Sequence, residues 1–396
     1  MKILVLNCGS SSAKFQLIEI EAKKLLAKGL LSRISMPGAQ LSYEVPGRAP
    51  LKVTGEILDH SVAIANILNI LTDKDFGVIQ DKSEIVGVGH RVVHGGEFFS
   101  DSVLITEDVL NKIRHCNDYA PLHNPHNIKG IVSCQQILPN VPNVAVFDTA
   151  FHMNMPDYAY RYGIPTIFYE KHGIRRYGFH GTSHYYVSQR AQELMNGDDI
   201  NVITCHLGNG CSITAVKKGK SVDTSMGFTP LEGLLMGTRS GDIDAAAVLQ
   251  IMEKEDLDSA NTATMLNKHS GLMGVSGKSN DMRDIVSAMS TGDGRALLAF
   301  NIFCYRLKKY IGSYFAALGG AQAVVFTGGI GENSALTREK TLEGLECLGI
   351  YIDKESNKQA VGCELEISTE KSPVKVFVIP TNEELVIAID TAKFIK

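Results

Sequence analysis

The sequence lacks the features that mark several large classes of protein. Its 396 residues contain 39 Lys and Arg against 43 Asp and Glu, a net charge of -4. Without an excess of basic charge, we expect neither a nucleic acid nor an anionic membrane as a partner. No run of about 18 apolar residues occurs, because Arg306, Lys308 and Lys309 interrupt the richest stretch, 296–318. We therefore expect no membrane span, and the short apolar N-terminus, which ends at Asn7, predicts a first strand and not a signal peptide.

Cysteine is not arranged for a disulfide framework or a CxxC metal site. The eight cysteines are scattered, and several lie in apolar runs, as Cys205 and Cys304 do. In such runs the thiol behaves as a small hydrophobic group. We expect reduced, buried thiols in a cytoplasmic protein. A chain of this length buries about 75% of its unfolded surface on folding, so neither disulfides nor a structural metal are needed for stability.

No linker of low complexity divides the chain, although its length favours two or three domains. Two similar hairpin patterns occur about 200 residues apart: ILVLN and KFQLIEI around a small-residue turn, and NVITCHL and CSITAV around a glycine turn. They predict an internal duplication. Further strands are expected at EIVGVGH, NVAVFD, 323–327 and 374–380, and helices near 59–71, 126–138, 184–195, 242–254, 295–318 and from about Glu384. This mixture predicts an α/β fold in each half, with domains that meet at a cleft.

Three turns combine the end of a strand with glycine or serine, at 7–12, 206–210 and 327–333. Such turns let backbone N–H groups approach an anion, which predicts phosphate and nucleotide loops. The alternative for any one of them is a tight turn without a ligand. The stretch 271–279 resembles a P-loop, but five residues separate Gly271 from Gly277, where the motif needs four.

Arg and His are embedded in glycine-rich or apolar surroundings in four segments, at 90–96, 121–126, 179–184 and 237–242. Arginine in such places commonly clamps a carboxylate or phosphate through its planar fork. An ordinary ion pair or a core imidazole is the alternative for each residue alone.

Two pairs of histidines have spacings that raise the question of zinc. His180 and His184 are four residues apart, and His123 and His126 three. Zinc is disfavoured, because the glutamate of an HExxH motif is absent and Gly181 weakens a helix there.

Polar side chains end three apolar runs: Asn7, Asp148 and Glu383. In α/β folds ligands bind outside strand ends, and oxygen ligands of this kind suit a Mg²⁺ ion shared with nucleotide phosphates. Helix capping is the alternative for Asp148 and Glu383.

Ten motifs together resemble the acetate kinase family, in the same order and over essentially the whole chain: VLNCGSSSAKF, GHRVVHGG, APLHNPHN, VFDTAFH, RRYGFHGTSH, HLGNGCS, MGTRSGDID, GKSNDMRD, FTGGIGEN and IPTNEEL. The resemblance implies two ribonuclease-H-like domains of the actin, Hsp70 and sugar kinase type around a nucleotide cleft, in a homodimer. The expected domains are 1–147 with about 384–396, and 148–383, the second binding nucleotide and forming the dimer. The implied reaction is reversible, Mg²⁺-dependent phosphoryl transfer between ATP and acetate, which gives acetyl phosphate and ADP.

The resemblance also implies roles for individual residues. Asn7 and Glu383 would bind Mg²⁺, or Mn²⁺ in its place. The nucleotide would contact Ser10, Ser12, Lys14, His206, Leu207, Gly208, Asn209, Gly210, Asp281, Met282, Arg283, Gly329, Ile330, Gly331, Glu332 and Asn333. Arg91 would hold the substrate carboxylate, and its methyl group would contact Val93, Leu122, Phe179 and Pro230. The catalytic groups would be Asp148, His180, Arg239, Arg91 and His123.

Elementary chemistry bears on these roles. A carboxylate is ionised at neutral pH, so its attack on the γ-phosphorus needs positioning and charge neutralisation more than a base. We therefore favour an orienting or Mg²⁺-linked role for Asp148, which the family uses as its catalytic acid. One alternative is a propionate or butyrate kinase, although the branched Val93 leaves less room than Ala or Gly would. Another is a non-catalytic relative of the chaperone or filament ATPases, which would not need the cationic set Arg91, Arg239 and His180.

Overall fold

The structure is a computed structural model that describes residues 1–197 and 199–395. The chain divides into two compact units: Met1–Ala150 with the chain from Asn382 onward, and Phe151–Thr381. The predicted boundaries would put Asp148 and Glu383 in the second unit, but both lie in the first. Asp148 follows a strand of the first unit and binds Arg91 there, and Glu383 opens a helix that packs on the same sheet.

The first unit is built on an eight-stranded sheet with the order β5-β4-β3-β2-β1-β6-β8-β7. Its strands are β1 Lys2–Cys8, β2 Ser12–Glu19, β3 Lys24–Ser32, β4 Ala39–Glu44, β5 Leu51–Gly55, β6 Ile85–Val92, β7 Val103–Leu104 and β8 Asn143–Phe147. β1, β6 and β8 are parallel, and the other pairings are antiparallel. The carboxyl ends of β1, β6 and β8 therefore meet at one edge of the sheet.

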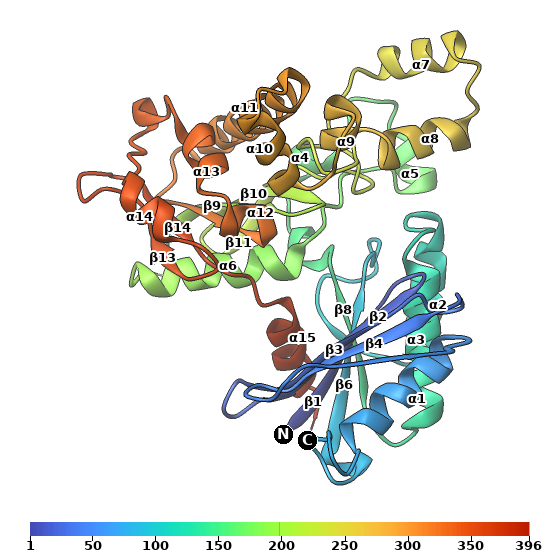
Figure 1. Ribbon diagram of the computed structural model, residues 1–396. Coiled ribbons are helices and arrows are strands. Elements are labelled where there is room, and N and C mark those ends of the chain that lie inside the picture. Colours follow the sequence, from blue (N-terminus) through green and yellow to red (C-terminus); the bar gives the residue numbers. More distant parts are fainter. Residues whose placement is uncertain (198, 396) are drawn as a thin grey trace. The chain divides into compact units, whose positions relative to one another are not determined.

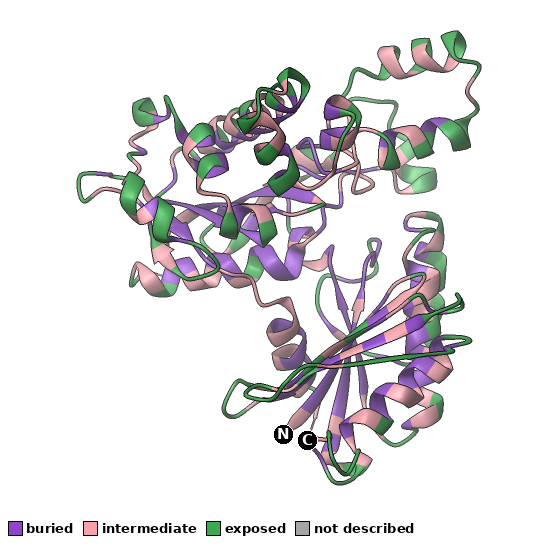
Figure 2. Cartoon of the chain, in the orientation of Figure 1, coloured by how far each residue is buried: buried purple, intermediate pink, exposed green. Residues whose placement is uncertain are grey.

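Helices cover both faces of this sheet (Figure 1). They are α1 His60–Leu71, α2 Glu107–His115, α3 Asn124–Ile137 and α15 Glu383–Ala392, with 3₁₀ turns at Lys82–Glu84 and Cys116–Asp118. β1 alternates between the faces as a strand must: Leu4 and Leu6 pack with α1, and Ile3 and Val5 pack with α15. The outer strand β5 is largely exposed, whereas the central strands are buried (Figure 2).

The second unit contains a six-stranded sheet with the order β11-β10-β9-β12-β14-β13. Its strands are β9 Asn201–Leu207, β10 Cys211–Lys217, β11 Lys220–Thr224, β12 Ala323–Thr327, β13 Leu365–Glu366 and β14 Lys375–Val378. β9, β12 and β14 are parallel, and β9, β10 and β11 form an antiparallel meander. The first five strands repeat the order β3-β2-β1-β6-β8 of the first unit, so the predicted duplication of an α/β, ribonuclease-H-like unit is confirmed.

The helices of the second unit are α4 Asp157–Tyr160, α5 Ile167–His172, α6 Gly181–Leu194, α7 Ala245–Lys254, α8 Ser259–Lys268, α9 Gly271–Ser276, α10 Met282–Ser290, α11 Gly294–Leu318, α12 Gly328–Asn333, α13 Ala335–Leu342 and α14 Lys354–Gln359, with 3₁₀ turns at Ala150–His152 and Glu346–Leu348. α11 begins where the Asp293 carboxylate accepts from the Ala296 N–H, and it ends at Gly319 with φ +69°. These are the ordinary start and stop signals of a helix. The helix packs against β10.

Two expectations need correction or limits. Six cysteines are buried as expected, but Cys347 and Cys363 are exposed. The helix expected from residue 242 begins at Ala245, because Asp244 caps it.

Within residues 1–197 and 199–395, none of the helices has the length and apolar character that a membrane crossing requires.

Candidate active site

The carboxyl edge of the first sheet gathers the polar residues that were predicted to end its strands. Leu6 lies beside His90 in the parallel register of β1 and β6, and Arg91 lies beside Val146 in that of β6 and β8. Asn7 and Arg91 come one residue after the Leu6–His90 pair, so they lie on neighbouring strands at the same level. Asp148 comes one residue after β8. The topology therefore brings together side chains that are far apart in the sequence.

Arg91 and Asp148 form a bidentate ion pair at this edge. The guanidinium donates from Nε to Asp148 Oδ1 at 2.8 Å and from Nη2 to Oδ2 at 2.6 Å. The Asp148 side chain is 1% exposed and that of Arg91 24%. Burial raises the pKa of the Asp148 carboxyl, while Arg91 and His123 act in the opposite direction. The pair fixes the orientation of the guanidinium, as parallel hydrogen bonds do.

Further carboxylates act on Arg91. Burial alone would favour its neutral form, but the charges of Asp148, Glu383 and Glu384 raise the pKa of the guanidinium above its usual value. Glu383 is the first residue of α15. His123 lies near enough to lower the pKa of Asp148 and is the residue before α3. Four predicted residues, Arg91, His123, Asp148 and Glu383, thus share one electrostatic environment.

The first hairpin places its predicted residues around the turn between β1 and β2. Asn7 pairs with Lys14 across the two strands, and Ser10 is exposed while Ser12 is half-buried. The Lys14 ammonium lies 2.5 Å from a carboxylate oxygen of Glu384. Glu384 was not singled out from the sequence, although it stands beside Glu383 in the motif IPTNEEL.

The residues predicted around the substrate methyl group belong to both units. In the first unit, Val93 is buried and Leu122 is 62% exposed. β6 ends at Val92, and the Val93 N–H donates to the Asn127 side chain at 3.1 Å. The strand ends one residue before Val93, so the alternation of faces along β6 does not place Val93 beside Arg91. In the second unit, Phe179 is buried and Pro230 is half-buried.

The second unit holds a pocket of about 710 Å³ at the end of β9 and β12. His206 pairs with Thr327 in the parallel register of these strands, so the two glycine turns that follow are neighbours. The pocket is lined by Gly208, Asn209, Asn280, Asp281, Met282, Arg283, Val286, Gly329, Ile330, Asn333 and Ser334. The three segments of the second unit that were predicted for the nucleotide therefore contribute to its wall, whereas Ser10, Ser12 and Lys14 of the first unit do not line it.

Some residues predicted to contact the nucleotide have side chains with a structural role. Glu332 accepts from the Gly328 N–H at 2.8 Å and the Thr381 N–H at 3.2 Å, so its carboxylate holds the turn. The Leu207 side chain is buried in the core. Asn280 was missed from the sequence, although it belongs to GKSNDMRD, and its amide donates to Asn209 at 2.9 Å.

Asp281 and Arg283 form a pair at the start of α10. The Asp281 carboxylate accepts from the Arg283 backbone N–H at 2.8 Å and lies 2.5 Å from its Nη2. These hydrogen bonds lower the pKa of Asp281 to about 2. The Arg283 side chain is 90% exposed, which leaves most of its surface open to a ligand.

His180 has an unusual backbone conformation directly before α6. Its φ of +56° is in the left-handed region, which costs energy for a residue with a side chain. Its ring stacks on that of His206 with centroids 4.3 Å apart, and its Nδ1 lies 2.9 Å from Ser212 Oγ. The strained backbone and the stacking fix the direction of the imidazole.

Arg239 lies on the long loop between β11 and α7, beside His180. A Cβ atom at Gly210 would lie 3.3 Å from Arg239 Nη1 and 3.5 Å from His180 Nε2. Both side chains therefore face Gly210 at about contact distance from the place that a Cβ atom would take. Arg239 Nη1 also donates to the Pro230 carbonyl at 3.2 Å.

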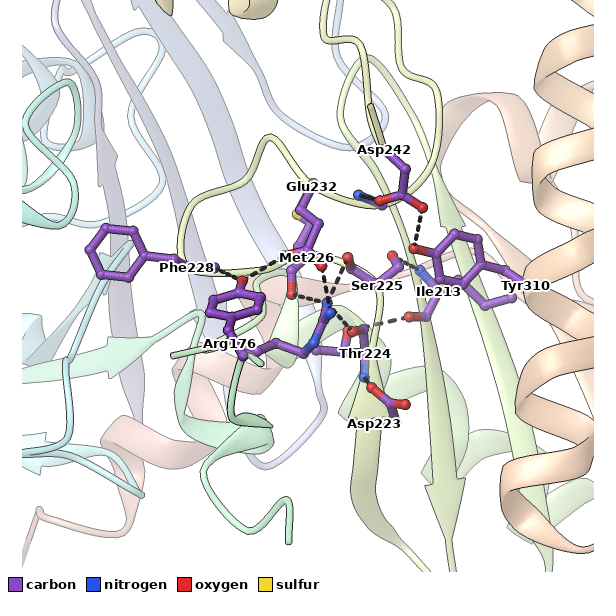
Figure 3. Close-up of polar contacts among 12 residues, drawn as sticks. Arg176, Ile213, Asp223, Thr224, Ser225, Met226, Phe228, Glu232, Asp242 and Tyr310 are labelled. Carbon is purple, nitrogen blue, oxygen red and sulfur yellow. Dashed lines mark hydrogen bonds and ion pairs between the residues drawn. The ribbon is translucent and has the colours of Figure 1, made fainter. Parts of the chain in front are cut away.

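Hydrogen bonds from a half-buried arginine stabilise the start of this loop (Figure 3). Arg176 Nη1 donates to the carbonyls of Thr224 and Ser225 at 2.9 and 3.0 Å. Its Nη2 lies 2.5 Å from Glu232, whose other oxygen accepts from the Tyr162 hydroxyl. Arg176 thus ties the end of β11 to the segment that leads to Arg239.

A second contact closes the loop on itself. Asp242 accepts from the Gly233 N–H at 2.8 Å and from the Tyr310 hydroxyl at 2.7 Å (Figure 3). Gly233 has φ +107°, and a Cβ there would lie 2.6 Å from the Ser225 carbonyl oxygen. Tyr310 of α11 therefore anchors the loop that carries Pro230 and Arg239.

The zinc alternative finds no support in the geometry. Among the described residues, no group of three or more His, Cys, Asp and Glu side chains is placed to hold a metal ion. Both ring nitrogens of His184 are instead hydrogen-bonded, to Thr204 and Ser212.

Comparison with known proteins identifies the family. The sequence profile of the acetokinase family matches residues 2–389. The chain belongs to this family. It is 58% identical to the acetate kinase of Caldanaerobacter subterraneus subsp. tengcongensis, over 100% of this chain and 99% of that protein. The crystal structure of Porphyromonas gingivalis acetate kinase is similar with a TM-score of 0.96 and 48% identity, over 100% of both chains. A propionate kinase structure from Francisella tularensis has a TM-score of 0.93 and 45% identity, over 99% of both chains.

Membership of the acetokinase family makes the chain a phosphotransferase with a carboxyl group as acceptor, and ATP and ADP are its co-substrates. The glycine turns and the arginines are therefore parts of a kinase, and the non-catalytic alternative is wrong.

Proposed function

We propose that the chain catalyses reversible phosphoryl transfer between ATP and acetate, with acetyl phosphate and ADP as products. One observation carries the proposal: Arg239 and His180 face Gly210, which belongs to the turn that contributes Gly208 and Asn209 to the pocket of three predicted nucleotide segments. A cation and an imidazole next to a glycine-lined pocket suit the charge of a transferring phosphoryl group.

The second unit binds the nucleotide in this proposal. The turn at 208–210 and the start of α12 offer backbone N–H groups to phosphates, and the start of α10 presents Asp281, Met282 and Arg283 at the pocket wall. We also infer that Lys14, Ser10 and Ser12 contact nucleotide phosphate, because a cation and hydroxyl groups suit that charge.

The first unit binds the acid. Arg91 holds the carboxylate of acetate, and Asp148 orients Arg91 through its two hydrogen bonds. His123 adds a polar group close to this pair. Because acetate is ionised at neutral pH, no general base is required.

The transfer itself is an in-line displacement. A carboxylate oxygen attacks the γ-phosphorus, a new P–O bond forms, and the bond to the oxygen shared with the β-phosphate breaks and leaves ADP. Charge spreads over the equatorial oxygens in the transition state. Arg239 and His180 donate hydrogen bonds to these oxygens and so lower the barrier.

A divalent cation fits the donor set at the edge of the first sheet. Asn7 is the last residue but one of β1, and Glu383 begins α15, which packs on β1. An amide and a carboxylate oxygen are hard ligands that suit Mg²⁺, or Mn²⁺, which takes its other ligands from phosphate and water. When bound, the ion neutralises phosphate charge.

The acceptor is acetate in preference to a longer acid. Val93, which is buried and directly follows β6, leaves less room for a longer acyl chain than a smaller residue would. Propionate is the alternative, since the Francisella tularensis relative, a propionate kinase, has 45% identity.

We also infer a cytoplasmic homodimer. Apolar side chains are exposed on and beside α4 and α5 of the second unit: Tyr158, Ile164, Ile167 and Phe168. A surface of this kind is typical of a subunit contact, and the supply of ATP places the reaction in the cytoplasm.

A chemical trap tests the activity. The protein is incubated with Mg-ATP, acetate and hydroxylamine, which converts acetyl phosphate to acetyl hydroxamate. A protein with Arg239→Ala serves as the control. We expect hydroxamate from the wild type, and none above the control would refute the proposed function.

A further inference from the structure

A chain of hydrogen bonds between buried side chains leads to His180. Thr204 Oγ1 lies 2.7 Å from His184 Nδ1, and His184 Nε2 lies 2.6 Å from Ser212 Oγ. Ser212 Oγ lies 2.9 Å from His180 Nδ1. Thr204, His184 and Ser212 are 0% exposed, so each of their hydrogens needs a partner within the protein.

His184 is uncharged in this chain. Burial lowers its pKa well below the usual value, and the neighbouring His152 and His206 act in the same direction. A neutral imidazole has one N–H, so one ring nitrogen donates a hydrogen bond and the other accepts one.

The hydroxyl of Thr204 sets the direction of the chain. In the part of the protein that the structure describes, His184 Nδ1 is the acceptor available to this hydroxyl. Thr204 therefore donates to Nδ1, and the proton of His184 is on Nε2. The reverse assignment would leave the buried Thr204 hydrogen without an acceptor, which is costly.

The same reasoning reaches His180 through Ser212. His184 Nε2–H donates to the Ser212 oxygen, so the Ser212 hydrogen points to its other partner, His180 Nδ1. If both imidazoles donated to Ser212, its own buried hydrogen would have no acceptor. Nδ1 of His180 must therefore accept, and the proton of this ring is on Nε2.

We propose that His184, acting through Ser212, is a positioning residue that keeps His180 in the neutral Nε2–H tautomer. The proposal rests on the proposed function, in which His180 donates to the transferring phosphoryl group. Nε2 faces Gly210 beside Arg239 Nη1. A neutral donor there adds a hydrogen bond without the repulsion that an imidazolium would meet from the guanidinium.

The residues around the His180 ring hold its Nε2 edge in position. His206 stacks on His180 with centroids 4.3 Å apart, and Ser183 Oγ lies 2.8 Å from His206 Nδ1. The left-handed backbone at His180 restricts it further. Rotation of the ring would break the bond to Ser212, so tautomer and orientation are fixed together.

The tautomer can be observed without any substrate. Protein labelled with ¹⁵N-histidine is studied by long-range ¹H–¹⁵N NMR at neutral pH, and His180→Asn assigns the His180 signals. We expect the shift pattern of a neutral ring with its proton on Nε2. The pattern of an Nδ1–H ring or of an imidazolium would overturn the proposal, whether or not the hydroxamate test succeeds.

Variants connect the tautomer to catalysis. Ser212→Ala removes the link, so we expect a mixed tautomer signal and a kcat about 100-fold lower, with KM for acetate and ATP within about twofold. Thr204→Val, at the far end, should change the same signals with a smaller loss of kcat.

Thr214→Val is the matched control. Thr214 lies two residues along β10, is equally buried, and bonds to Thr224 at 2.8 Å outside the chain to His180. It should leave the His180 signals and kcat near the wild type. If Ser212→Ala and Thr214→Val have equal kcat and equal His180 spectra, Ser212 has only a structural role and the proposal fails. Should Ser212→Ala not fold, the wild-type spectrum and Thr204→Val still decide.

Discussion

Arg91 binds Asp148 through two parallel hydrogen bonds, and Asp148 is almost fully buried beneath the guanidinium. The pair supports the orienting role that we propose for Asp148, in contrast to the role of catalytic acid that the family resemblance implies. The two roles have different kinetic consequences.

Asp148→Asn separates these roles. The amide turns one N–H toward a donor of Arg91, so the guanidinium loses its orientation and we expect KM for acetate to rise about tenfold or more, which corresponds to about 1.4 kcal/mol. Steady-state kinetics against acetate measures this. A fall in kcat with unchanged KM would instead support the catalytic acid.

The two arginines of the site should have distinct signatures. Arg91→Ala removes a group that binds the ground-state carboxylate, so KM for acetate should rise strongly. Arg239→Ala removes charge stabilisation in the transition state, and kcat should fall by about 10³ or more. Similar KM effects and an intact kcat in both variants would contradict this division.

Metal dependence tests Asn7 and Glu383. Replacing either residue by Ala removes an oxygen ligand, so the Mg²⁺ concentration for half-maximal rate should rise. Glu384→Gln is the control, because Glu384 lies on the same turn of α15 but pairs with Lys14. A Mg²⁺ dependence that is unchanged in Asn7→Ala and Glu383→Ala would show that these residues are structural.

Val93→Ala tests the limit on acyl length. The substitution removes two methyl groups, and one methylene in an apolar pocket changes discrimination by about 10- to 200-fold. We expect kcat/KM for propionate relative to acetate to rise at least about tenfold, with little change in kcat for acetate. A ratio within twofold of the wild type would mean that Val93 does not contact the substrate.

Two buried histidines predict a loss of stability in acid. Burial lowers the pKa of His90 and of His152 to about 4, against 6.5 for the unperturbed ring. Their contribution to stability is present above pH 6.5 and is lost as the pH falls toward 4, because the unfolded chain takes up protons first. Each should cost about 2 kcal/mol between pH 7 and pH 5.

Urea unfolding at these two pH values measures the effect. His90→Gln, which keeps an amide donor for the Asn143 side chain that His90 Nε2 contacts at 2.7 Å, should lose less stability over the same interval. An equal loss in the variant and the wild type would exclude His90 as a source.

The sequence was sufficient for much of the fold, because both central hairpins and both sets of parallel strands have strong apolar runs. The outer strands β4 and β5 were not predicted, since β5 is largely exposed and contains Lys52 and Thr54. α10 was not predicted from the sequence. Its N-cap is Asp281, and aspartate is as common in loops as at the start of a helix.

The candidate site was less accessible from the sequence. Motifs indicated the residues, but only the strand register explains why Asn7, Arg91 and Asp148 meet. The contacts of Glu384, Asn280 and Ser212 depend on neighbours more than 30 residues away in the chain. No local pattern encodes such partners, because small polar residues are common on any surface or turn.

Because the two sheets share a strand order, residues at equivalent positions of the two units can be compared. Asn7 and His206 are each the sixth residue of the seven-residue strand that comes first in its sheet, and their partners across the hairpin are Lys14 and Ser212. Gly9 and Gly208 follow the two strands at the same place. Where the halves agree, as at these glycines, the N–H donates to a carbonyl across the turn, that of Ser12 in the first unit and that of Gly210 in the second. Where they differ, as at Asn7 and His206, equivalent positions of the two sheets carry different chemistry, an amide in the first unit and an imidazole in the second.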